Sequence, residues 1–265
     1  MKNIIAVNFQ NHEKYPFEKL EKEMKAQIEN SLQLGWNSED ILLVTNFEYS
    51  FMGINAFNIP LNDFCLTGTK VFVMRELFKR DMIKGVVWIH DLDVWQVHPF
   101  ECPNFADVGI STYSNIRKFN GGTQFYKPES IDIVYRLVEE IERDKSSREE
   151  PSIQRVFNYP EYSGRITTLN NTYNLGCSGY VKRFERSVKP VKAVHFHPSN
   201  RIAWSVHCRD RNRLGTTSVS KRLYNLFLKY FKDDIKNYEY KEEKDKEHRG
   251  NYEPPKYILK SWEND

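Results

Sequence analysis

The sequence predicts an α/β fold in which a central, mostly parallel sheet is flanked by helices in a Rossmann-like, doubly wound arrangement. An apolar segment at Ile4–Phe9, an amphipathic segment at Phe17–Leu34 and a second apolar segment at Asp40–Thr45 follow one another, and this β-α-β order is typical of doubly wound sheets. The stretch Gly85–Trp95 then begins as a buried strand, rich in β-branched and aromatic residues, and ends in two carboxylates. A chain of 265 residues with 40% hydrophobic residues can bury a full core of this kind.

The first helix is predicted over Phe17–Leu34. Apolar side chains recur there every three or four residues from Leu20 to Leu32, among lysines and glutamates, which is the spacing of one helix face. Gly35 stands just past the end, where glycine commonly terminates a helix. The segment is therefore an amphipathic helix that covers one face of the sheet.

An irregular, aromatic segment follows at Phe47–Phe64, with a short strand near Phe57–Ile59. A second helix is predicted over Thr67–Arg80, and Lys70 lies in its first turn. A helix N-terminus with a lysine beside it favours an anion. An ordinary surface lysine near a helix start is the alternative.

A strand is predicted over Asp107–Thr112, after the two carboxylates. The run Asn120-Gly121-Gly122 is predicted as a flexible elbow that opens a further strand ending near Tyr126. Glycines at such a place let a backbone approach a ligand closely, and a plain hairpin turn is the alternative. Two helices are predicted beyond it, over Ile131–Ile141 and Pro151–Phe157.

The remaining chain is predicted as short strands and turns over Arg165–Leu175, a strand over Val191–Pro198 that proline closes, and an amphipathic helix over Val219–Phe231. Charged residues dominate after that helix, so the last segment is expected to be an extended tail. We therefore expect one domain over residues 1–215, and a C-terminal helix with a charged tail over residues 216–265.

The net charge of +3 is too small to favour nucleic acid as a partner. The segment Lys182–Arg213 is strongly basic, with Glu185 and Asp210 as its acidic residues. A local basic surface beside a metal site favours a phosphorylated small ligand. An ordinary solvated face is the alternative.

The cysteines and the apolar runs indicate the cellular compartment of the protein. Cys65, Cys102, Cys177 and Cys208 lie far apart, without zinc spacing, as expected of a reduced protein. The sequence after Met1 has no signal-peptide pattern, and no apolar run is long enough to span a bilayer. We expect a cytoplasmic protein that at most contacts a membrane surface.

The two carboxylates, Asp91 and Asp93, flank Leu92 at the carboxyl end of the predicted central strand. Ligands of open α/β sheets bind at that edge, because the loops leaving the strands form the crevice there. If the chain bends after Asp91, one carboxylate can meet a divalent metal and the other its water shell or a ligand hydroxyl. Oxygen ligands suit Mg²⁺ or Mn²⁺. A solvated turn is the alternative.

Three motifs, in this chain order, resemble those of nucleotide-sugar-dependent glycosyltransferases of the GT-A fold, most like the family 8 group and its viral and bacterial relatives. Val87–Trp95 looks like the D-x-D metal motif, Asn120-Gly121-Gly122 is similar to the N-x-G segment, and Val194-His195-Phe196 looks like the late histidine-phenylalanine pair. The resemblance covers roughly the first 210 residues. The family's K-P-W segment is replaced by His197-Pro198-Ser199-Asn200-Arg201.

This resemblance implies a site built from distant parts of the chain. It implies that Asp91, Asp93 and His195 hold the metal, Mn²⁺ or Mg²⁺, on the donor diphosphate. Val194 and Phe196 share the apolar face of a strand, so His195 points to the opposite face, toward the two carboxylates, and we assign the metal to His195. The donor-binding residues expected with them are Asn8, Phe9, Lys70, Asp91, Leu92, Asn120, Gly121, Gly122, His197 and Arg201, with Arg201 in place of the missing lysine.

The resemblance implies transfer of a sugar from a nucleoside-diphosphate sugar, with uridine as the expected base, to a hydroxyl acceptor such as a glycan. Asp93 and a base, Glu150 or Glu149, are the catalytic candidates. An inverting enzyme needs that base and a retaining enzyme does not, and the alternative for both glutamates is a helix N-terminal charge. A metal-dependent nucleotidyltransferase or phosphohydrolase, and a non-catalytic module that binds sugar or nucleic acid, are the alternative functions.

Overall fold

The computed structural model describes residues 1–10, 16–61, 68–112, 118–144, 149–176, 187–195, 222–223 and 225–233. The chain divides into two units, Met1–His197 and Pro198–Asp265. Every residue of the site described below that the structure places belongs to the first unit.

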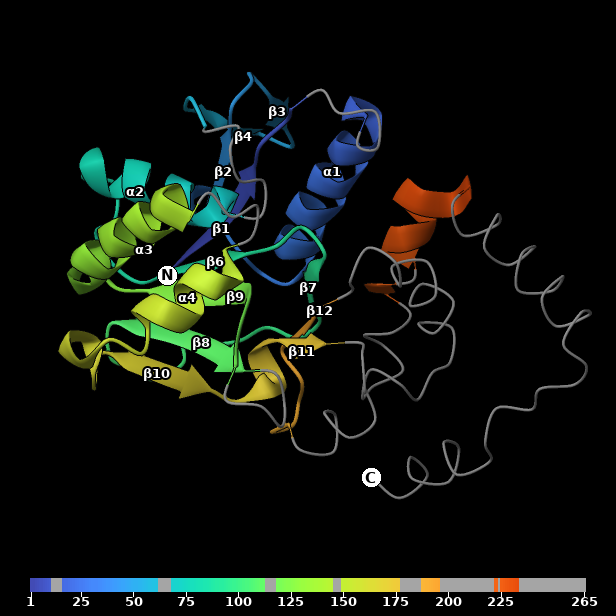
Figure 1. Cartoon of the computed structure of the whole chain (residues 1–265). Helices are drawn as coiled ribbons and strands as arrows, with labels where there is room; N and C mark the ends of the chain where they lie inside the picture. The colour runs from blue at the N-terminus through green and yellow to red at the C-terminus, as the bar shows by residue number, and fades with distance from the viewer. Residues whose placement is uncertain are drawn as a thin grey trace, which may run out of the picture. The chain divides into compact units, whose positions relative to one another are not determined.

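A seven-stranded sheet forms the centre of the first unit, in the order β10-β8-β9-β6-β1-β2-β5 (Figure 1). Its strands are β1 (Lys2–Val7), β2 (Ile41–Thr45), β5 (Phe57–Asn58), β6 (Val87–His90), β8 (Val108–Thr112), β9 (Phe119–Tyr126) and β10 (Ile166–Leu169). Strand β9 runs antiparallel to both of its neighbours, β8 and β6. The other adjacent pairs are parallel, which confirms the predicted mostly parallel sheet.

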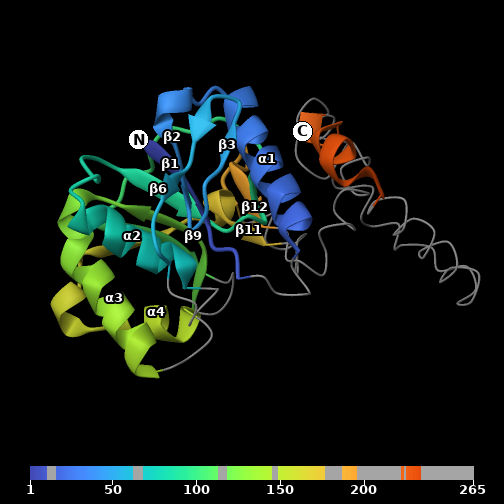
Figure 2. The same ribbon diagram turned by 90° about the horizontal axis from the view of Figure 1, so that it is seen from above.

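Helices cover both faces of this sheet (Figure 2). They are α1 (Phe17–Gln33), α2 (Thr69–Lys79), α3 (Ile131–Asp144) and α4 (Glu150–Val156). Short 3₁₀ turns lie at Ser38–Asp40, Pro128–Ser130, Pro160–Tyr162 and Asn171–Tyr173. All four helices start and end within a few residues of the positions that the apolar periodicity predicts.

The alternation of side chains along the strands assigns each helix to a face. Ile4 of β1 and Ile89 of β6 lie in one apolar cluster with buried residues of α2, α3 and α4. Ile5 of β1 packs in a second cluster with Met24 and Ile28 of α1. Because successive residues of a strand point to opposite faces, a run of apolar residues is required in β1, and the sequence supplies it.

Helix α1 ends where the sequence predicts. Gly35 adopts φ +89°, a left-handed conformation that costs glycine little. The N–H of Gly35 and the N–H of Trp36 then bond to carbonyls of the last turn, those of Leu32 and Ser31. These bonds satisfy carbonyls that a helix end otherwise leaves unpaired.

A smaller three-stranded sheet packs beside the carboxyl end of β6, in the order β11-β12-β7. Its strands are β7 (Val94–Gln96), β11 (Leu175–Gly176) and β12 (Ala193–His195). A two-stranded hairpin is formed by β3 (Ser50–Phe51) and β4 (Ile54–Asn55). The small sheet matters for the site because β12 pairs with the strand that follows Asp93.

The prediction of a flexible elbow at Asn120-Gly121-Gly122 is wrong. These residues are buried within the eight-residue strand β9. They lie at the place where the pairing of β9 with β8 shifts register, between Ile110 and Thr112 of β8. The absence of a Cβ at Gly121 and Gly122 instead leaves room for two side chains of the site, Glu149 and His195.

The second unit is described in part. Residues 222–223 and 225–233 are helical, within and just beyond the helix predicted over Val219–Phe231. The boundary expected at residue 215 and the charged tail lie outside the described residues and remain predictions. No helix in the described part of the chain is long and apolar enough to cross a membrane.

Candidate metal centre

Asp91 and Asp93 lie in a tight turn between β6 and β7. The backbone N–H of Asp91 bonds to the Gly122 carbonyl at 2.9 Å, as the last rung beside β9. The N–H of Val94 then bonds back to the Asp91 carbonyl at 3.0 Å. The carbonyl of Asp91 also accepts a bond from Nδ1 of buried His90 at 2.8 Å. The predicted bend after Asp91 is therefore present, and it carries both carboxylates.

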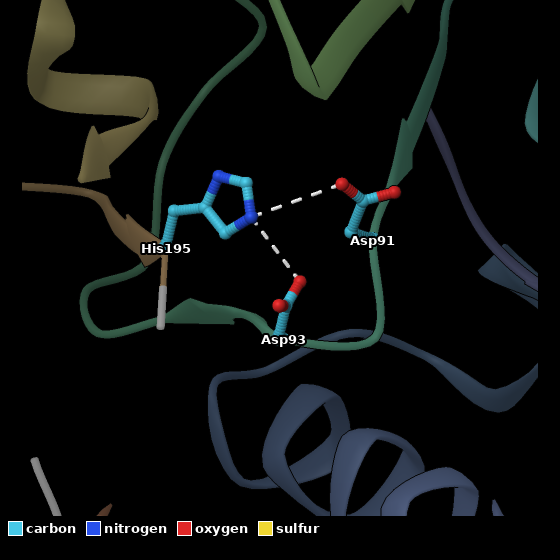
Figure 3. A group of neighbouring side chains, drawn as sticks. All are labelled: Asp91, Asp93 and His195. Atoms are coloured by element: carbon cyan, nitrogen blue, oxygen red, sulfur yellow. Dashed lines mark ion pairs between the residues drawn. The ribbon is translucent and has the colours of Figure 1, made fainter. Parts of the chain in front are cut away.

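His195 reaches this turn through the small sheet. Strand β12 pairs antiparallel with β7, and His195 stands opposite Val94. Its Nε2 lies 3.2 Å from Oδ1 of Asp93 and 3.8 Å from Oδ2 of Asp91 (Figure 3). A side chain far along the sequence thus meets both carboxylates, as expected from the alternation that sends His195 away from the apolar face.

The donor set fits a divalent cation. One ligand atom from each of Asp91, Asp93 and His195 lies within 4.8 Å of the others. Two carboxylates and an imidazole suit Mn²⁺ or Mg²⁺, with nitrogen favouring manganese. Asp93 and His195 are buried while Asp91 is partly exposed, so the cluster has a dry side and a side open to a ligand. Burial alone would lower the pKa of His195, but the hydrogen bond and charge of Asp93 and the charge of Asp91 raise it.

Lys70 lies in the first turn of α2, as predicted, but it is buried. Its Nζ pairs with Oδ1 of Asp91 and, at 2.8 Å, with Oε1 of Glu149. Burial would lower the pKa of Lys70, and the two carboxylates outweigh that effect and raise it. Lys70 therefore engages one oxygen of Asp91 while the other faces His195.

Glu149 stands directly before α4 and is only 3% exposed. Burial raises its pKa to about 7, although Lys70 opposes the rise. The amide of Gln124 on β9 lies against it, with Nε2 at 3.4 Å from Oε1 of Glu149 and 2.8 Å from the Gly121 carbonyl. Strand β9 and the start of α4 thus join Lys70 in one buried network.

The two glycines of β9 make this packing possible. A Cβ on Gly122 would overlap Cε1 and Nδ1 of the His195 imidazole, and a Cβ on Gly121 would overlap Oε1 of Glu149. In the structure, the lack of a Cβ at these glycines allows His195 and Glu149 to lie against the strand. Contact of the glycine backbone with a donor remains a prediction.

Asn120 completes this corner of the site. Its Oδ1 accepts bonds from the N–H of Gly122 at 2.9 Å and from Nδ2 of Asn174 at 2.6 Å. Both asparagines are buried. Asn174 was not among the predicted site residues, since one asparagine in a polar segment carries no sequence signal of its own.

Three more predicted donor residues lie at this edge of the sheet. Asn8 and Phe9 follow β1, whose Ile5 pairs with His90 of β6. The backbone of Phe9 is held by the Asn46 side chain, which both accepts from its N–H and donates to its carbonyl at 2.8 Å. The side chain of Leu92 packs against the apolar cluster around α1. The donor contacts of all three remain predictions.

Glu150, the predicted base, is the first residue of α4 and is partly buried. His197 and Arg201 lie outside the described residues, so their expected donor contacts remain predictions. The same holds for most of the basic segment Lys182–Arg213.

Comparison by sequence finds no matching family model and no matching curated protein. Comparison by structure finds glycosyltransferases. A glycosyltransferase involved in glycosylation of the major capsid of PBCV-1 superposes with a TM-score of 0.51 at 12% identity, covering 76% of this chain and 97% of that one. The galactosyltransferase LgtC, in complex with donor and acceptor sugar analogues, gives 0.52 at 14% identity, covering 87% and 96%. GlyE of Streptococcus pneumoniae TIGR4 gives 0.53 at 12% identity, covering 88% of this chain and 64% of that chain.

Identities this low show a shared fold and no more. The chain therefore has the fold of these glycosyltransferases, which is the GT-A fold that the sequence predicts.

Proposed function

We propose that this chain is an enzyme that transfers a sugar from a nucleoside-diphosphate sugar, with uridine as the expected base, to a hydroxyl acceptor such as a glycan. The observation that carries the proposal is the meeting of Asp91, Asp93 and His195 at the carboxyl edge of the sheet, in a fold that glycosyltransferases share. The three residues come from two distant segments, so the cluster does not follow from local sequence alone.

The reaction must neutralise the charge that develops on the leaving nucleoside diphosphate. A divalent cation held by Asp91, Asp93 and His195 would supply that positive charge. Lys70 adds a fixed positive charge beside Asp91 and holds that carboxylate in place. Arg201 is assigned a further contact to the diphosphate, as the sequence suggests.

The acceptor hydroxyl attacks the anomeric carbon. Glu150 is our candidate for the base of an inverting reaction, because its neighbour Glu149 is buried and paired with Lys70. A retaining reaction would not need a base at this position. The stereochemistry of the product decides between these mechanisms.

The proposal is tested first by binding. Nucleotide sugars are screened by thermal shift with and without Mn²⁺, because a ligand at 100 times its dissociation constant stabilises by about 2.7 kcal/mol. A UDP-sugar should stabilise the protein when Mn²⁺ is present, and EDTA should remove the effect. The same ligand should have little effect on Asp93→Asn.

Turnover is tested second, by release of nucleoside diphosphate with glycan acceptors. Release that depends on both metal and acceptor supports a transferase. Hydrolysis of nucleoside triphosphates or phosphate esters without an acceptor would instead support a nucleotidyltransferase or phosphohydrolase. Sugar binding that is the same with and without metal would support a non-catalytic module. Binding of nucleic acid that weakens steeply with salt would contradict the proposal.

A further inference from the structure

Helix α1 carries a buried amide on its apolar face. Gln27 is only 1% exposed and lies one residue from Ile28 and three from Met24, both fully buried in the cluster between α1 and the sheet. A polar side chain in such a place costs free energy unless its donors and acceptors find partners. Its contacts therefore indicate what it does.

The amide of Gln27 donates to the backbone of the turn that carries the carboxylates. Its Nε2 lies 2.7 Å from the carbonyl of Leu92 and 2.8 Å from the carbonyl of Val94. Because an amide nitrogen has two hydrogens, both donors are used. The amide oxygen could not face two carbonyl oxygens, so the contacts also fix the orientation of the group.

These two carbonyls lie on either side of Asp93. The other bonds of the turn hold Asp91, through the carbonyl of Gly122 and the N–H of Val94. Gln27 thus ties the second half of the turn to a rigid helix, at the residue whose carboxylate lies 3.2 Å from His195.

The turn needs such a tie because of its charges. Asp91 and Asp93 are separated by one residue, and buried Glu149 reaches the same network through Lys70. Like charges in a partly buried site repel one another. Without a restraint, the two carboxylates would move apart, and cation binding would have to bring them together again.

We infer that Gln27 is a positioning residue for the metal centre: it holds Asp93 in the orientation that binds the cation. This inference rests on the proposed function, because it deepens the role of the same site. Supporting groups of this kind typically change metal affinity or activity by about 10- to 100-fold when they are removed.

The same helix offers a matched control. Asn30 is also fully buried, and its Nδ2 donates to the carbonyl of Gln96 at 3.1 Å. This bond holds the far end of β7, three residues beyond Asp93. Asn30 therefore shares the chemistry of Gln27 and its burial, but its bond is made to the far end of β7 and not to a carbonyl beside Asp93.

The experiment compares Gln27→Met and Asn30→Leu, which replace each amide by an apolar group of similar size. Mn²⁺ binding is measured by electron paramagnetic resonance, with and without UDP, and thermal unfolding is measured alongside. Both variants should unfold at a lower temperature, since each removes an amide that donates to buried backbone. Gln27→Met should weaken Mn²⁺ binding by about 10-fold or more, and Asn30→Leu should bind Mn²⁺ like the wild type.

A second variant, Gln27→Asn, keeps an amide and withdraws it by one methylene, so it tests the reach of the group if Gln27→Met does not fold. It too should lose affinity for Mn²⁺. Wild-type affinity in either folded Gln27 variant, or an equal loss in Asn30→Leu, would overturn the inference and leave the proposed function standing. A wild-type protein that binds no Mn²⁺ in either condition would overturn both.

Discussion

Two buried glutamates of this protein experience opposite surroundings. Glu140 on α3 is 1% exposed and Glu149 at the start of α4 is 3% exposed. Burial raises the pKa of both carboxyl groups, but the result differs. For Glu140 the hydroxyl of Tyr159 and three arginines outweigh burial and lower the pKa. For Glu149 burial prevails over Lys70, and the pKa rises to about 7.

The difference lies in the balance of charge around each carboxylate. Glu140 forms ion pairs with three arginines: Arg136 at 3.2 Å, Arg155 at 3.4 Å, and Arg143. Around Glu149, by contrast, the described residues include one lysine, and it is shared with Asp91.

This comparison separates a complete ionic cluster from an incomplete one. Buried charge is tolerated when it is paired, and the Glu140 cluster meets this condition with protein groups. In the described part of the chain, the site sets Asp91, Asp93 and Glu149 against Lys70 and a histidine. That excess of negative charge favours a cation, so the comparison predicts different responses to substitution at the two places.

The largest expected effect is that of Asp93→Asn. Removing one ligand charge should weaken Mn²⁺ binding by at least about 100-fold, beyond the usual effect of a supporting group. The unfolding temperature should stay the same or rise, because the substitution relieves repulsion with Asp91. Electron paramagnetic resonance measures the Mn²⁺ affinity, and thermal unfolding measures the change in unfolding temperature. Full transfer activity with unchanged Mn²⁺ affinity would remove Asp93 from the metal centre.

A second effect is expected from Gly122→Ala. The added Cβ would overlap the His195 imidazole, so the ring should move away from the carboxylates and Mn²⁺ affinity should fall by about 10-fold. Gly85→Ala is the matched control, since a Cβ there meets nothing within 4 Å. If Gly122→Ala bound Mn²⁺ as tightly as Gly85→Ala, His195 would have no part in holding the cation.

In the complete cluster, Glu140→Gln should affect stability rather than binding. The amide keeps the size of the side chain but loses its attraction to the arginines, so we expect a loss of about 1–3 kcal/mol in unfolding free energy near neutral pH. Glu139→Gln is the control, at an exposed neighbour that pairs with Arg136 at 3.0 Å. It should change the unfolding free energy little. Mn²⁺ binding should be unaffected in both.

The pH dependence of this effect has a definite sign. The folded pKa of Glu140 lies below its ordinary value of 4.5, so its contribution is present above that pH and is lost as the pH falls through the folded pKa. The difference in unfolding temperature between wild type and Glu140→Gln should therefore shrink in acid. A difference that grew in acid would contradict the assigned charge state.

The smallest effect is expected at Arg165. This residue pairs with Asp107 and with Asp132, each at 2.6 Å, and all three side chains are partly exposed. Exposed pairs contribute about 0.2–1 kcal/mol each, so Arg165→Met should lower stability by roughly that amount per pair. Chemical denaturation at low and high salt measures it. A loss that did not diminish in salt would place these pairs with the buried clusters.

The sequence determined the elements of the fold and the ligands of the candidate site. Periodic apolar residues specified the helices because burial selects one face, and the strand that ends at Asp91 and Asp93 was recognisable from its apolar run. His195 could be placed on the face opposite Val194 and Phe196 because side chains alternate along a strand, and the structure brings His195 to the two carboxylates.

Only the tertiary structure decided how those ligands are supported. The run Asn120-Gly121-Gly122 looked like a turn because glycine is common in turns, yet it lies inside β9, where His195 and Glu149 need the space. The pairing of Lys70 with Glu149, and the bonds of Gln27 to the turn, join residues far apart in the chain. Local sequence cannot encode such contacts, because they depend on which strand ends the fold brings together.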